Sequence, residues 1–246
     1  MHTVKLVIAY DGTDFHGWQV QPETRTVQGE IESVLSLMTG EHTRLYGAGR
    51  TDAGVHALGQ VGHFRTESTI SREEFFRGLN GLLPDDISIL SVEDVSGGFD
   101  ARRTATARVY RYFVCEGDVP LPFTRRYVWH IRDRLDVERM KRAADHFIGT
   151  HDFASFAGAG GDDEVTIRDV QALSIFRNRG GIIEIYVEAN AFLRHMVRNL
   201  AGTLVEVGRG KRDPGEMPDV IDAKDRAAAG ETAPACGLFL VEVKYP

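Results

Sequence analysis

Cysteine is scarce in this sequence, which has only Cys115 and Cys236 among its 246 residues. Two cysteines cannot form a disulfide framework, and neither belongs to a CxxC pair. A small disulfide-stapled secreted fold is therefore excluded. We interpret both thiols as small apolar side chains and expect a reducing compartment, the cytoplasm.

Long hydrophobic runs are also missing. No stretch approaches the roughly 18–20 apolar residues that a membrane-spanning helix needs. In the opening MHTVKLVIAYDG, the apolar residues are interrupted by Lys5 and end at Asp11, without the basic segment and cleavage site of a signal peptide. We expect neither a membrane span nor a signal peptide.

Positive charge is in deficit, because 29 lysines and arginines face 36 acidic residues for a net charge of −7. Phosphate contacts need lysine and arginine, so this chain is not a uniformly basic nucleic-acid binder. Two local runs are nevertheless basic. Residues 101–111 hold four arginines and no acid, and residues 194–212 hold five basic residues with Glu206 alone against them. Each run is either a solvated face or a local surface for a polyanion.

Several catalytic motifs are absent. The chain has no GK[ST] phosphate loop, no GxSxG nucleophile elbow and no HExxH zinc motif. His56 and His63 lack the spacing of zinc ligands, and we interpret them as structural residues. The acidic residues in GAGGDDE, at 158–164, are interpreted as the tip of an exposed loop rather than as a metal site. We predict no metal centre.

What remains is a chain of average composition, 42% hydrophobic and 26% charged, that can bury a core. Hydrophobic periodicity predicts strands interleaved with amphipathic helices. Strands are predicted at residues 3–10, 57–65, 87–95, 105–115, 167–177, 181–188 and 238–245. Helices are predicted at residues 26–38, from 71, at 136–148, at 192–207 and after 218. Each half has one long amphipathic helix, which indicates duplication with a break near residue 104.

The densest local signal is GAGRTDAGVH at Gly47–His56. Its glycines let the backbone turn tightly and let a large group approach closely. Arg50, Thr51 and Asp52 lie between them. Taken alone, the pattern leaves two interpretations open, a loop with surface charges or a catalytic loop.

Five segments in order resemble the tRNA pseudouridine synthase A family, nearly from end to end. They are IAYDGTDFHGWQVQP at 8–22, GAGRTDAGVHALGQVGHF at 47–64, TARVYRYFV at 106–114, NAFLRHMVRNLAGTLVEVG at 190–208 and PACGLFLVEVKYP at 234–246. The resemblance implies an α+β fold of two similar domains, with antiparallel or mixed sheets and flanking helices around a central cleft. We assign residues 1–104 and 105–246 to these domains.

The resemblance places the family's catalytic aspartate on Asp52. Pseudouridine formation breaks the N1–C1′ bond of uridine and joins C5 to C1′, so no cofactor is needed. The ionised carboxylate either attacks C1′ or removes a ribose proton, and the sequence leaves both routes open. By resemblance Arg198, on a helix, is the cation that pairs with this carboxylate through two parallel hydrogen bonds.

Three further residues are expected at the substrate. Tyr110 is the platform on which the flipped uracil stacks, since the family's tyrosine falls there. Tyr112 points to the same side of the strand and is interpreted as a core aromatic. By analogy Arg50 helps to displace or hold the nucleotide, and Leu238 forms the apolar wall opposite the tyrosine.

The implied partner is the anticodon stem-loop of tRNA, with uridines 38, 39 and 40 as targets, bound by a homodimer. Three alternatives stay open. A non-catalytic RNA-binding module is disfavoured because Asp52 is present. A nucleoside hydrolase is disfavoured because glycosidic hydrolysis usually uses two carboxylates. Pseudouridylation of another RNA is the third.

Overall fold

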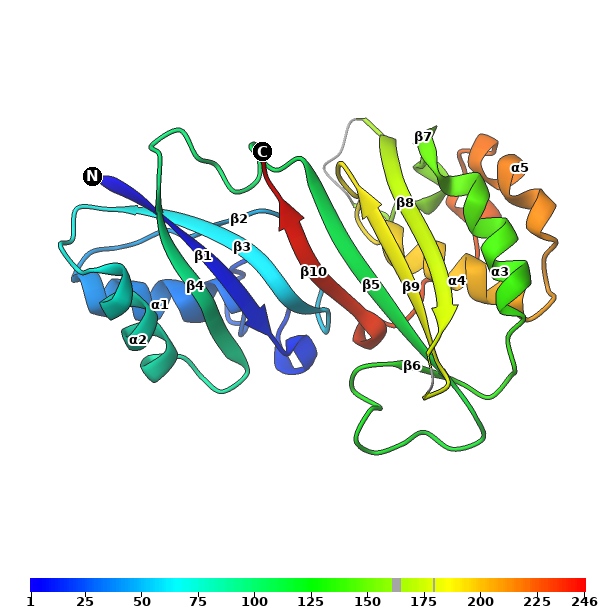
Figure 1. The fold of residues 1–246 in the computed structure, drawn as a ribbon, viewed down its shortest axis with the longest axis horizontal. Coiled ribbons are helices and arrows are strands. Elements are labelled where there is room, and N and C mark those ends of the chain that lie inside the picture. The colour runs from blue at the N-terminus through cyan, green and yellow to red at the C-terminus, as the bar shows by residue number, and fades with distance from the viewer. Residues whose placement is uncertain (161–164, 179) are drawn as a thin grey trace. The chain divides into compact units, whose positions relative to one another are not determined.

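The computed structural model describes residues 1–160, 165–178 and 180–246. Within this part of the chain, five α-helices accompany strands that pair in both antiparallel and parallel fashion (Figure 1). The predicted α+β class is confirmed. None of the helices described is long and apolar enough to cross a bilayer.

The chain forms two compact units. The first contains Met1–Thr106 and Phe239–Pro246, and the second contains Ala107–Leu238. The C-terminal residues join the first unit because β10 (Leu238–Lys244) pairs with a strand of that unit. Each unit is defined by the contacts that its residues make with one another. The predicted domain boundaries and the central cleft stay predictions.

The first unit has a sheet in the order β4-β1-β3-β10. The strands β1 (His2–Tyr10), β3 (His56–Thr66) and β4 (Ile87–Val95) pair antiparallel, while β10 pairs parallel to β3. A short strand, β2 (Tyr46–Gly47), also pairs with β3. The predicted inward face of β1 is confirmed, because Val4, Leu6, Ile8 and Tyr10 are all buried.

Two helices pack side by side in this unit, and the second contacts β4. Helix α1 (Val27–Thr39) begins at Thr26, whose side chain accepts a hydrogen bond from Gly29 N, and ends at Gly40. Helix α2 (Arg72–Leu82) begins at the predicted capping box. Its Phe75 meets Phe64 of β3 edge to face, at 5.4 Å between ring centroids.

The second unit has an antiparallel sheet in the order β5-β9-β8-β7, with β6 parallel to β5. Its strands are β5 (Ala107–Glu116), β6 (Trp129–Ile131), β7 (Gly149–Asp152), β8 (Ile167–Arg177) and β9 (Ile182–Ala189). Its helices are α3 (Val137–Ala144), α4 (Met196–Gly208) and α5 (Met217–Asp222). Helices α3 and α4 pack on each other, α3 contacts β8, and α4 contacts β5.

Two predicted helices were too long. The helix predicted at 136–148 ends at Ala144, and a 3₁₀ turn, Asp145–Phe147, leads into β7. The helix predicted from 192 begins at Met196, because His195 adopts a left-handed conformation with φ 60°. Apolar residues at helical spacing continue through both turns, so periodicity did not reveal where the backbone leaves the helix.

Two predicted loops lie partly outside the described residues. The turn between β8 and β9 closes with a hydrogen bond from Asn178 N to Ile182 O, and Gly181 has φ 78°, while residue 179 is not described. Of the loop predicted at 158–164, residues 161–164 are not described.

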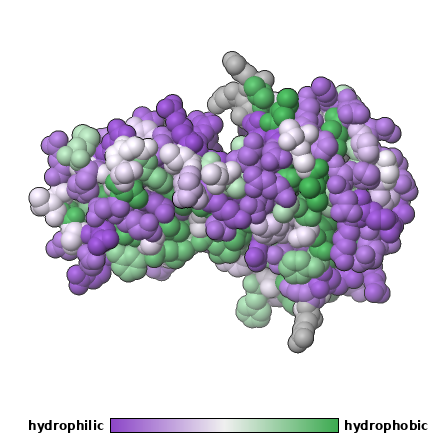
Figure 2. All heavy atoms as spheres, turned by 45° about the horizontal axis from the view of Figure 1, so that its top comes forward, coloured by the Kyte–Doolittle hydropathy of each residue, from purple (hydrophilic) through white to green (hydrophobic). Residues whose placement is uncertain are grey.

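Hydrophilic side chains cover most of the face shown in Figure 2, and hydrophobic ones gather there in smaller groups. Each unit has its own apolar core. The largest side chains without solvent exposure include Phe64 and Phe75 in the first unit, and Phe147, Phe153 and Phe156 in the second. The predicted site residues of each unit are therefore carried by strands, helices and loops that pack on a buried core.

Candidate active site

The loop that carries Asp52 is called here the signature loop, residues 47–56. It leaves β2 and enters β3, so both ends are fixed by pairing within the sheet of the first unit. Ala48 N donates to Val61 O at 2.8 Å, and the Gln60 amide donates to Gly49 O at 2.9 Å. The first half of the loop is thereby tied to the strand that follows it.

The second half of the loop lies on the segment that follows β1, residues 11–18. Trp18 N donates to Thr51 O at 3.1 Å, and Gly54 N donates to Phe15 O at 3.3 Å. At the end of β1, the buried Tyr10 hydroxyl is 2.8 Å from Thr51 Oγ1. Burial raises the pKa of Tyr10, so the phenol stays neutral and keeps this hydrogen bond.

Asp52 opens a tight turn between these anchors. Val55 N donates to Asp52 O at 3.2 Å, and Gly54 has φ 77° at the third position of the turn, where L side chains are strained. Thr51 is buried and Asp52 is half-buried, whereas Ala53 is exposed. The backbone of the aspartate is therefore held by its neighbours on both sides.

Glycines make this contact possible. A Cβ atom at Gly12 would lie 2.0 Å from Val55 O, and one at Gly17 would lie 2.6 Å from Thr51 O. Gly17 also has φ 92°. Because real Cβ atoms do not approach a carbonyl oxygen so closely, the two backbones can touch only where these positions lack side chains.

The two histidines near the signature loop have structural roles, as predicted. His56 Nδ1 accepts a hydrogen bond from Gly12 N at 3.0 Å, and its ring stacks on Phe239 at 4.6 Å. His63 Nδ1 accepts from Ala101 N at 3.1 Å, and burial lowers the pKa of His63, which favours the neutral ring that can accept. No group of three or more potential ligands that could hold a metal exists among the described residues.

Arg50 shares the signature loop with Asp52, and its side chain is exposed. It lies on the half of the loop that is tied to β3. The other three predicted site residues, Tyr110, Arg198 and Leu238, belong to the second unit.

Tyr110 lies in the middle of β5, opposite Val187 of β9. It is 8% exposed, and its ring meets Phe192 edge to face at 5.0 Å and 85°. Tyr112 is fully buried and its hydroxyl donates to Pro234 O at 2.7 Å, which confirms the interpretation as a core aromatic.

Arg198 lies in the first turns of α4, the helix that contacts β5. Its Nε donates to Ala233 O at 2.8 Å, and Ala233 N donates to Arg198 O at 3.2 Å. Burial raises the pKa of Tyr112 and of the Cys236 thiol, and the positive charge of Arg198 opposes both shifts. Arg198 is half-buried, like Cys236, whereas Tyr112 is fully buried.

Leu238 is the first residue of β10 and is buried, with 5% exposure. It follows the 3₁₀ turn Ala235–Gly237, and its N–H donates to Ala235 O. The backbone of Leu238 is thus fixed by a hydrogen-bonded turn.

The residues that hold these side chains in place were not predicted from the sequence. Tyr10, Gly12 and Gly17 fix the signature loop, and Ala233 fixes Arg198. The match of residues 8–22 to the family opening was the one available signal, because that segment contains the loop anchors. Nothing local marked Ala233.

The sequence model and the relatives that match this chain all bear the name of one enzyme family. The sequence model of tRNA pseudouridine synthase matches residues 6–102 and 143–246. A tRNA pseudouridine synthase A of Brevibacillus brevis is 47% identical over 245 residues. Those of Geotalea uraniireducens and Thermoanaerobacter sp. are 45% and 44% identical, and each alignment covers 100% of both chains. The chain therefore belongs to the tRNA pseudouridine synthase family.

Among solved structures, the archaeal box H/ACA sRNP Nop10-Cbf5 complex matches 82% of this chain and 44% of that chain. The TM-score is 0.37 and the sequence identity is 11%.

The contact beneath the signature loop can be tested with Gly12→Ala. The added methyl group would meet Val55 O at 2.0 Å, so the loop and its supporting segment must separate. We expect a loss of about 1–3 kcal/mol in the free energy of unfolding, measured by urea denaturation. Gly97→Ala is the matched control, because nothing lies within 4 Å of Gly97, and we expect a change within about 0.5 kcal/mol. Equal stability of the two variants would contradict the close contact.

Proposed function

We infer that this protein isomerises uridine to pseudouridine in transfer RNA. The observation that carries this inference is membership of the tRNA pseudouridine synthase family along the whole chain, with an aspartate at residue 52 in the signature loop. The reaction conserves every atom of the substrate and transfers no electrons. The chain's own side chains can therefore supply the chemistry.

Asp52 is proposed as the catalytic residue. Its carboxylate either attacks C1′ of the target ribose while the N1–C1′ bond breaks, or removes a ribose proton and takes up the role of a base. In both routes uracil turns within the site and C5 bonds to C1′. In the first route this bond displaces the Asp52 carboxylate from C1′, and in the second Asp52 returns the proton to the ribose. The proton on C5 is released to water, and N1 takes up a proton in its place. The anchored turn around Asp52 supports either role, because the carboxylate needs no large rearrangement before reaction.

Four further residues are proposed to bind the nucleotide. Arg198 would pair with the Asp52 carboxylate, since a guanidinium can give a carboxylate two parallel hydrogen bonds. Tyr110 would stack on the flipped uracil, and Leu238 would close the apolar side of its pocket. Arg50, exposed on the signature loop, would contact the displaced strand or the phosphate of the target nucleotide.

We propose that the targets are uridines 38, 39 and 40 in the anticodon stem-loop. An enzyme can reach a base in a stem only if the base is extruded, so the substrate must be unpaired locally before Asp52 meets its sugar. The free energy needed to unpair the base is smallest where the RNA helix is least stable, and this favours the end of a stem next to a loop.

A homodimer in the cytoplasm is also proposed. The net charge of −7 is unfavourable for one chain on a polyanion, and two copies would bring the basic runs at 101–111 and 194–212 from both chains to one tRNA. Light scattering of the purified protein should give the mass of two chains. The mass of one chain at working concentration would contradict the dimer.

The catalytic assignment predicts that Asp52→Asn abolishes isomerisation. The change keeps the size of the side chain and removes the charge that both routes need. Tritium release from tRNA labelled at C5 of uridine should fall by more than about 100-fold, with tRNA affinity close to that of the wild type. Asp85→Asn, an identical change at an exposed position, is the control and should stay active. Wild-type activity of Asp52→Asn would reject the assignment.

The stacking role predicts a difference between two variants of Tyr110. Tyr110→Phe keeps the flat ring, whereas Tyr110→Ala removes it. Stacking of a base on an aromatic ring contributes about 1–3 kcal/mol, so kcat/KM should fall roughly 5- to 150-fold in Tyr110→Ala and far less in Tyr110→Phe. Thermal unfolding of each variant confirms that it is folded. If both variants lose activity to the same extent, the ring is not a stacking platform.

A further inference from the structure

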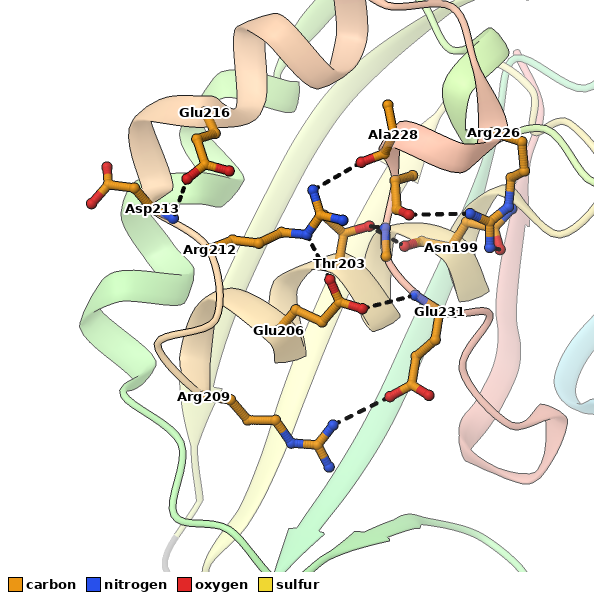
Figure 3. Close-up of polar contacts among 12 residues, drawn as sticks. Asn199, Thr203, Glu206, Arg209, Arg212, Asp213, Glu216, Arg226, Ala228 and Glu231 are labelled. Atoms are coloured by element: carbon orange, nitrogen blue, oxygen red, sulfur yellow. Dashed lines mark hydrogen bonds and ion pairs between the residues drawn. The ribbon is translucent and has the colours of Figure 1, made fainter.

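Helix α4 carries a stripe of polar side chains on a largely buried face (Figure 3). This polar stripe consists of Asn199, Thr203 and Glu206, which are spaced four and three residues apart and so share one side of the helix. Asn199 and Thr203 are completely buried. Buried polar groups are costly unless they are hydrogen-bonded, so this face needs polar partners.

The partners come from residues 229–233, called here the crossing segment, which forms neither helix nor strand. Three consecutive residues of this segment each donate a hydrogen bond to one member of the polar stripe. These bonds are Gly230 N to Thr203 Oγ1 at 2.9 Å, Glu231 N to Glu206 Oε1 at 3.1 Å and Thr232 Oγ1 to Asn199 Oδ1 at 2.7 Å. The crossing segment is therefore held to α4 residue by residue.

Two arginines brace the same contacts (Figure 3). Arg226 Nη2 donates to Asn199 Oδ1 at 3.0 Å and to Thr232 Oγ1 at 2.9 Å. Arg212 Nε donates to Glu206 Oε2 at 2.6 Å. Arg212 thus neutralises the charge of Glu206, and Arg226 fixes the orientation of the Asn199 amide.

Gly202 brings the two backbones together. It lies on α4 between Asn199 and Thr203, and a Cβ atom there would be 1.7 Å from Glu231 O. No side chain fits at this distance. The crossing segment thus lies directly on the helix backbone, where even one methyl group would lift it away.

The crossing segment ends at the residue that fixes Arg198. Ala233 O accepts the hydrogen bond from Arg198 Nε at 2.8 Å. A bond at Nε sets the plane of the guanidinium, so the terminal Nη groups are the ones that can give two parallel hydrogen bonds to a carboxylate. The direction in which they point follows the position of one backbone carbonyl.

We propose that the polar stripe and Gly202 position Arg198 for the isomerisation, acting through the crossing segment. The proposal rests on the role given above to Arg198. Arginine has a long, flexible side chain, and its charge stabilises a reacting group only when it is held in place. A misplacement of about 1 Å in a catalytic group lowers a rate by roughly 100-fold, so a small shift of Ala233 is enough to matter.

The direct test is Gly202→Ala. We expect kcat for tRNA isomerisation to fall by about 10- to 100-fold with KM nearly unchanged, because the variant displaces the guanidinium and leaves the rest of the tRNA-binding surface intact. Gly81→Ala in α2 is the matched control, since it makes the same change inside a helix with nothing within 4 Å. It should keep wild-type kcat and KM. Normal turnover by folded Gly202→Ala would overturn the proposal.

Combination with Arg198→Lys separates positioning from a general structural role. Lysine keeps the charge and has no Nε–H to donate to Ala233 O, so the carbonyl no longer orients it. If the crossing segment acts through Arg198, adding Gly202→Ala to Arg198→Lys should lower kcat no further. A second full loss, multiplied on the first, would show that Gly202 acts independently of Arg198 and would overturn the proposal.

A milder pair of variants decides the matter if Gly202→Ala does not fold. Thr203→Val keeps the shape of the side chain and removes the acceptor for Gly230 N, whereas Thr203→Ser keeps the hydroxyl. We expect kcat to fall about 10-fold in Thr203→Val and to recover in Thr203→Ser. Equal kcat in both would overturn the proposal.

The same series distinguishes this proposal from the assigned role of Arg198. Full activity of Arg198→Lys and Arg198→Ala would remove that role and the positioning proposal with it. Loss of activity in both, with normal turnover in the Gly202 and Thr203 variants, would refute the positioning proposal alone.

Discussion

Direct contact between two backbones holds the signature loop. Residues 51–55 touch residues 12–17 directly at Gly12 and Gly17, where an added Cβ atom would clash with Val55 O and Thr51 O. The backbone of Asp52 is fixed because the residues on either side of it are hydrogen-bonded to neighbouring segments. Such fixed support is what a charged group needs if it is to react without a prior rearrangement of the protein. Gly202 plays the corresponding part in the second unit, where Glu231 O lies against α4. Both candidate charges, the carboxylate and the guanidinium, are thus supported by glycine contacts.

Much of the fold was predictable from hydrophobic periodicity. Strands β4 and β8 have the predicted bounds, 87–95 and 167–177, and α2 begins at its predicted capping box. The failures have two causes. Strands β2, β6 and β7 are too short to show alternation, and α3 and α4 differ from the predicted helices where the backbone turns while apolar side chains continue. Periodicity reports which face is buried, and it does not report how the backbone turns at an end.

The candidate site was predictable only in part. The local pattern around Asp52 favoured a surface loop and left a catalytic loop open. The family resemblance supplied the roles of Asp52, Tyr110 and Arg198, which stay predictions. The structural roles of His56 and Tyr112 were predicted and are confirmed by their hydrogen bonds. The supports could not be read from the sequence, because each joins positions that only the folded chain brings together. Examples are Gly12 with Val55, 43 residues apart, and Gly202 with Glu231, 29 residues apart.

Pseudouridine mapping in total tRNA shows whether this protein isomerises uridine in the anticodon arm. Cells that make this protein are compared with cells in which it has been deleted, and with deleted cells that carry the wild-type gene again. We expect uridine in place of pseudouridine at positions 38–40 of the anticodon arm on deletion, return of pseudouridine with the gene, and no change in pseudouridine elsewhere in tRNA. An identical pseudouridine map in all three would contradict it.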